Sequence, residues 1–126
     1  MYARLFLCTV VSLHCFALGG CSGVRELEAI PTDLLGIWKT DAARYRNRFL
    51  EVRHGEVILG AGIYALDHFA VRRVEVEALD QGHLYRLHYR ADEGYLDQLE
   101  LALRPSPTPT LYVGKIPFPW RPSTTR

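Results

Sequence analysis

Four residues in the middle of the chain combine the charges and aromatic rings of a ligand-binding site: Arg72, Tyr89, Tyr95 and Asp97. Two interpretations of this group are open. In the first it is a structural plug, in which Arg72 and Asp97 form an inward ion pair that closes the rim of a barrel, because inward charges usually pair. In the second it is the polar end of a pocket for a small ligand. Both require all four side chains to share the inner face of one sheet.

A second candidate is the basic run of Arg44, Arg46 and Arg48, which surrounds Tyr45 and Asn47. Such a patch can bind an anionic partner, for example a lipid headgroup or a cell-wall polymer. Short basic runs are also ordinary solvated loops, and that alternative stays open. The chain holds 15 basic and 14 acidic residues, so its net charge of +1 gives no electrostatic reason to expect nucleic acid as a partner.

The other reactive residue types lack the spacing that catalysis or metal binding requires. No cysteine follows Cys21, and no later serine lies on a strand–turn–helix elbow of the kind that activates a nucleophile. The histidines of the second half match no metal-ligand pattern; they are His54, His68, His83 and His88. We therefore predict no metal, no cofactor and no enzymatic activity.

Alternation of apolar and polar residues predicts the strands that must position these side chains. A two-residue turn at 54–55 pairs Val52 with Val57 and Leu50 with Leu59. These pairings place the aliphatic side chains of both strands on one face.

A meander follows, built from a two-residue turn at 81–82 and a three-residue loop at 92–94. This register pairs Val76 with Leu87, Leu87 with Leu99, and Arg86 with glutamates on both sides. It also aligns Val74, Tyr89 and Asp97, with Arg72, Ala91 and Tyr95 in the next inner row. However, Phe69 and Val71 have the opposite parity from Val74, which is what a β-bulge at 72–73 would produce. Such a bulge would turn Arg72 to the outer face.

Further short strands are expected at 36–40, 111–115 and 116–120, and Pro117 and Pro119 confine the last of these to a sheet edge. A helical turn or two is expected at 24–30. The chain is therefore predicted to be all-β, a small antiparallel meander barrel or a strongly curled sheet over residues 34–126. A signal peptide at 1–20, which is cleaved, and a tether at 21–33 precede that domain.

The first twenty residues show a secretory layout, with Arg4 before an apolar run at 5–18. The run is shorter than the about 20 residues of a membrane-spanning helix, although an uncleaved anchor is the alternative. The segment Leu18-Gly19-Gly20-Cys21 resembles the lipobox of bacterial lipoproteins. This resemblance implies cleavage before Cys21, a diacylglyceryl group on its thiol, and acylation of the new amine. Ser22 in the following position implies sorting to the outer membrane of a Gram-negative bacterium.

The segment Gly36-Ile37-Trp38 resembles the Gly-x-Trp motif that opens the first strand of lipocalins and other calycins. The resemblance implies a β-barrel and no particular ligand. The lid helix and the late sequence motif of lipocalins are not visible in this chain.

Together these features predict a non-enzymatic accessory or binding protein of the cell envelope. It is anchored to the membrane through the lipid on Cys21, and its expected partner is an envelope protein or a small apolar ligand. The alternative is a lipocalin-like carrier of a small apolar or amphipathic molecule. The volume of an interior cavity would separate the two, because a large cavity takes space from a core of this size.

Overall fold

The computed structural model describes residues 23–62, 65–91 and 94–126, and these residues form an antiparallel β-barrel that is nearly closed. The proposed lipobox lies outside the described residues. The strands are β1 (Arg25–Leu27), β2 (Gly36–Lys39), β3 (Arg48–Val52), β4 (Glu56–Ala61), β5 (Ala65–Leu79), β6 (Gly82–Arg90), β7 (Leu96–Arg104), β8 (Thr110–Val113) and β9 (Arg121–Ser123). Two 3-10 helices, η1 (Thr32–Leu34) and η2 (Ala43–Tyr45), lie on either side of β2 in the chain.

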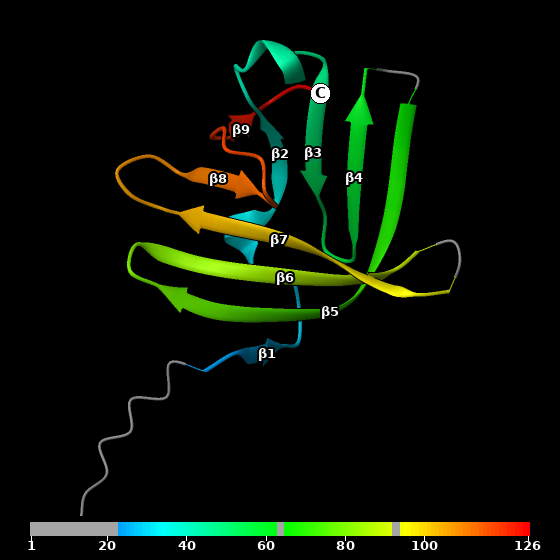
Figure 1. The fold of residues 1–126 in the computed structure, drawn as a ribbon, viewed down its shortest axis with the longest axis vertical. Helices are drawn as coiled ribbons and strands as arrows, with labels where there is room; N and C mark the ends of the chain where they lie inside the picture. The colour runs from blue at the N-terminus through cyan, green and yellow to red at the C-terminus, as the bar shows by residue number, and fades with distance from the viewer. Residues whose placement is uncertain (1–22, 63–64, 92–93) are drawn as a thin grey trace, which may run out of the picture.

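Eight strands follow one another around the barrel in the order β8-β7-β6-β5-β4-β3-β2-β9. The ring is closed by a single bridge between Leu111 and Trp120, whose backbone groups exchange hydrogen bonds of 2.9 and 2.8 Å. Figure 1 shows β9 beside β2, although the two strands come from opposite ends of the chain. The prediction of a small antiparallel barrel is confirmed.

Strand β5 belongs to both halves of the barrel because it bends at a β-bulge. Its first part pairs with β4, and the register then shifts between Val71 and Arg73, after which the strand pairs with β6. Beyond the bulge β4 no longer follows β5, and β1 pairs there instead, with Leu27 opposite Val74. The helical turn predicted at 24–30 is therefore wrong, since residues 25–27 satisfy their backbone groups in a sheet.

The core is an apolar cluster drawn from both halves of the barrel. Its centre has no solvent exposure at Leu34, Leu50, Leu87, Leu101 and Leu111. Trp38 is 2% exposed, and its indole N–H donates to the Leu34 carbonyl at 2.9 Å. The prediction of a strand that opens at Gly36 is confirmed, and its tryptophan lies in the core.

Two of the three predicted hairpin registers are confirmed. Strand β3 pairs with β4 through Val52–Val57 and Leu50–Leu59, and β6 pairs with β7 through Leu87–Leu99. The predicted turn at 81–82 is wrong, because the turn lies one residue earlier and the register is therefore shifted by two residues.

The two residues that connect β5 to β6 are 80 and 81, and Val76 lies opposite Tyr85 instead of the predicted Leu87. Gly82 has a positive φ of 116°, but it is the first residue of β6 and does not lie inside the turn. Because the register shift is an even number of residues, every side chain between the bulge and the turn keeps its predicted face. Arg86 therefore still reaches Glu77 at 2.8 Å and Glu100 at 3.7 Å.

The strand expected at 116–120 is also wrong. Residues 114–119 form turns and bends, and only Trp120 bridges to β8 before the short strand β9 begins. The prolines at 117 and 119 lack the N–H groups that a ladder needs.

Candidate functional site

An apolar cleft of about 440 Å³ opens at the end of the barrel where η2 lies. Its lining comes from η2, β3, β4 and the start of β5, together with β7, β8 and the segment before β9. This volume lies within the range of small-molecule sites, which are concave, mostly apolar and bounded by a few polar groups. The apolar side chains of the lining are Phe49, Leu50, Leu59, Ala61, Ala65, Leu99, Val113, Ile116 and Trp120.

The cleft also contains polar groups at its rim. Tyr45, Arg48 and Asp67 belong to its lining, and the Arg48 guanidinium lies 5.4 Å from the centre of the Tyr45 ring. The Tyr45 ring in turn packs 6.1 Å from Phe118 and 6.1 Å from Trp120. The basic run predicted from the sequence therefore contributes to the mouth of the cleft.

Trp120 carries a buried polar group without a partner. The residue is 4% exposed, and its indole N–H finds no acceptor among the described residues. A buried donor that forms no hydrogen bond costs about 1–3 kcal/mol.

The structure separates the four residues Arg72, Tyr89, Tyr95 and Asp97. Arg72 lies in the bulge of β5 and is exposed, and Val71 lies opposite Tyr89, where Val74 was predicted. The predicted ion pair between Arg72 and Asp97 is wrong, because the bulge reverses the orientation of Arg72. Tyr95 lies just before β7 and is 70% exposed.

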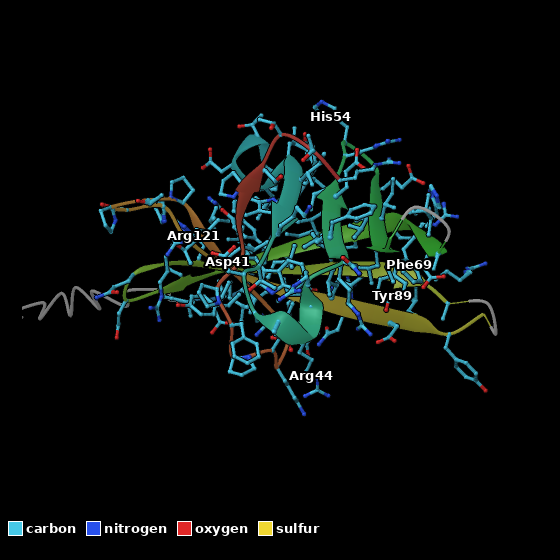
Figure 2. The ribbon with its side chains drawn as sticks, turned by 90° about the horizontal axis from the view of Figure 1, so that it is seen from above. Asp41, Arg44, His54, Phe69, Tyr89 and Arg121 are labelled. Atoms are coloured by element: carbon cyan, nitrogen blue, oxygen red, sulfur yellow. The ribbon has the colours of Figure 1, made fainter. Side chains whose placement is uncertain are left out.

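Tyr89 and Asp97 do meet, as the registers predict. The Tyr89 hydroxyl donates to Asp97 Oδ2 at 3.3 Å, and the Tyr89 ring packs 4.6 Å from the ring of Phe69. Figure 2 shows the two rings side by side. Partial burial, followed by the Asp97 charge, raises the pKa of Tyr89, so the hydroxyl stays protonated and remains a donor.

A second concave region of about 680 Å³ lies between β2, β9 and the segment leading into η2. Three cationic side chains line this basic groove: Lys39, Arg46 and Arg121. Lys39 and Arg121 are directly opposite each other in the β2–β9 ladder. One carboxylate, Asp41, also lines the groove, and Figure 2 shows Asp41 and Arg121 in the same region of the molecule.

Sequence reasoning identified Arg44 and Arg46 but missed Lys39 and Arg121. Arg44 is exposed, and its guanidinium lies 5.9 Å from the Tyr45 ring centre. The missed pair had no local signal, because the pairing of β2 with β9 joins distant parts of the chain.

The histidines lie apart in the structure. His68 Nδ1 is 2.6 Å from Glu56 Oε1, and His88 Nε2 is 3.3 Å from Glu75 Oε2 without forming a hydrogen bond. His54 is exposed in the β3–β4 turn. Across residues 23–62, 65–91 and 94–126, no three side chains of the metal-binding types come together.

No family model, curated protein or solved structure matches this chain. Among the described residues, no helix has the length and apolar character needed to cross a bilayer.

Proposed function

We propose that this protein is a lipid-anchored, non-enzymatic binding protein of the cell envelope whose barrel takes up a small amphipathic ligand. The apolar cleft with its polar mouth carries the proposal. A chain of methylene groups in such a cleft gains about 0.8 kcal/mol per buried CH₂, and Arg48 and Tyr45 lie where a polar headgroup would emerge. In this proposal, a carrier of a small amphipathic molecule is one form of the broader envelope-binding protein.

The anchoring part of the proposal depends on Leu18-Gly19-Gly20-Cys21, the segment that resembles a lipobox. Acylation at more than one point makes a membrane anchor durable, whereas one acyl chain binds only marginally. We propose that Cys21 carries this lipid and that the outer membrane holds the protein. Mass spectrometry of the processed chain should find an acylated Cys21, and Cys21→Ser should accumulate as an unprocessed precursor. An unmodified Cys21 in processed wild-type protein would contradict the anchor.

Ligand uptake can be tested on a chain that begins at Ser22, since this chain keeps every described strand and the whole core. The neutral fluorophore N-phenyl-1-naphthylamine serves as the probe, because its emission rises in apolar surroundings. We expect saturable binding to the wild type and its loss in Ala65→Trp, which places a large side chain in the mouth of the cleft.

Ala70→Trp is the matched control. Ala70 lies on the same strand, is exposed, and has the opposite parity, so its side chain faces away from the cleft. Both variants should retain the wild-type melting temperature. If Ala65→Trp binds the probe as well as Ala70→Trp does, the cleft is not the binding site and the proposal fails.

A further inference from the structure

Among the described residues, the cations of the basic groove lack the ion-pair partners that several other arginines of the barrel have. On the outer face of the β5–β6–β7 meander, Arg73 pairs with Glu75 at 3.2 Å and Arg86 pairs with Glu77 at 2.8 Å. In contrast, no carboxylate within the described parts of the chain comes within 4.0 Å of Lys39, Arg46 or Arg121. The groove therefore concentrates positive charge that the protein does not itself neutralise.

The placement of Lys39 opposite Arg121 adds a specific cost. Like charges that face each other directly across two antiparallel strands destabilise the sheet. Their strands also help to close the barrel, so the two strands cannot easily separate to relieve the repulsion. An anion held between the two side chains would convert this repulsion into attraction.

The chemistry of the groove favours phosphate over carboxylate. Two guanidinium groups and one ammonium group approach from three different elements, which suits a tetrahedral group with oxygens in several directions better than a flat carboxylate. Thr40 also lines the groove, and its hydroxyl oxygen accepts from the Ala42 N–H at 3.4 Å. Its hydroxyl proton remains able to donate to a phosphate oxygen.

We propose that Lys39, Arg46 and Arg121 form a binding site for a soluble ligand that carries more than one phosphate group. The groove is separate from the apolar cleft, and the proposal holds whether or not the cleft binds a ligand. Arg48, which lines an adjoining hollow together with Lys39 and Arg46, extends the positive surface beyond a single phosphate. Arg126 also lines this hollow, but its guanidinium is paired with Glu51 at 2.7 Å.

The position of the groove favours a soluble ligand over the headgroups of the anchoring membrane. Figure 1 shows β1 at the opposite end of the barrel from β9 and η2. Cys21 precedes Arg25 by four residues, which span at most about 14 Å when extended. With Cys21 lipidated as proposed, the β1 end lies against the membrane and the groove faces away from it.

The experiment measures binding of tripolyphosphate by isothermal titration calorimetry, using the chain that begins at Ser22. We expect saturable binding that weakens as salt is added. Arg46→Gln and Arg121→Gln should each reduce affinity on the order of tenfold, the loss expected for one hydrogen bond to a charged group. Asp41→Asn should tighten binding, because it removes the carboxylate that lines the groove.

Arg90→Gln is the matched control, since Arg90 is exposed on β6, has no ion-pair partner among the described residues, and lies outside the groove. An equal loss of affinity in Arg90→Gln would show that only net charge matters and would overturn the proposal. Absence of tripolyphosphate binding to the wild type would also overturn it. Cosedimentation with phosphatidylcholine vesicles, with and without phosphatidylglycerol, tests the other source of phosphate. Binding to the anionic vesicles without binding to tripolyphosphate would refute a soluble ligand.

Discussion

Truncation of Trp38 should test whether the opening strand holds the barrel together. The Trp38 side chain is 2% exposed, lies opposite Leu50 in β3 and Pro122 in β9, and is hydrogen-bonded to the Leu34 carbonyl. Loss of a buried large aromatic costs about 3–5 kcal/mol. Trp38→Ala should therefore lower the free energy of unfolding by about that amount. Because this is a large fraction of the roughly 5–15 kcal/mol of a typical domain, the variant is expected to be marginally stable.

Trp38→Phe separates packing from hydrogen bonding. Phenylalanine keeps most of the apolar contact but leaves the carbonyl of the fully buried Leu34 without its donor, at a cost of about 1–3 kcal/mol. Both variants can be followed by urea unfolding, and Trp120 remains as the fluorescent reporter because the chain has two tryptophans.

The control for both is Tyr95→Ala, an aromatic truncation at a side chain that is 70% exposed, which should change stability by less than about 0.5 kcal/mol. The reasoning is refuted if Trp38→Ala unfolds at the same urea concentration as Tyr95→Ala. It is also refuted in part if Trp38→Phe matches the wild type, because the hydrogen bond to Leu34 would then contribute nothing.

Three further predictions concern local features. Asp97→Asn should bring the pKa of Tyr89 closer to its ordinary value, as followed by tyrosinate absorbance, since one of the causes that raise this pKa is removed; an unchanged titration would show that burial acts alone. Partial burial raises the pKa of Glu51, but hydrogen bonds from Arg53 and Arg126 outweigh it and the net pKa is lowered. The stability from Glu51 is therefore present above its unfolded-state pKa and is lost as the pH falls through the folded-state pKa, so Glu51→Gln should flatten the acid side of a plot of urea midpoint against pH. Gly82→Ala should destabilise the β5–β6 hairpin, because a Cβ there meets the Leu103 carbonyl oxygen and the φ of 116° disfavours alanine; a wild-type melting temperature would argue against this turn geometry.

The sequence could predict the local hairpins because their information lies in neighbouring residues. The alternation in β3, β4, β6 and β7 determines which face is apolar, and the predicted faces remain correct despite the two-residue error in the β5–β6 register. The position of that turn was harder to predict, because a glycine with positive φ fits equally well inside a turn or directly after it.

The candidate sites depended on features that local patterns do not specify. The bulge at Arg72 decides whether one arginine faces the core or solvent, and only the parity change after Val71 pointed to it. The basic groove depended on the pairing of Lys39 with Arg121, and nothing near either residue indicates that partner. The cleft is a space between strands, and no single segment encodes its volume.

The way in which the barrel closes has a consequence for the order of folding. Hairpins from β3 through β8 join strands that are neighbours in the chain, so each can form with little loss of chain entropy. The β2–β9 ladder instead joins residues 37–39 to residues 121–123, and closing so large a loop is entropically costly until the intervening strands are in place. The meander is therefore expected to assemble first, and residues 121–123 to dock last. Until they dock, Trp38 lacks one of its neighbouring strands, and a newly made chain exposes the apolar surface that the finished barrel encloses.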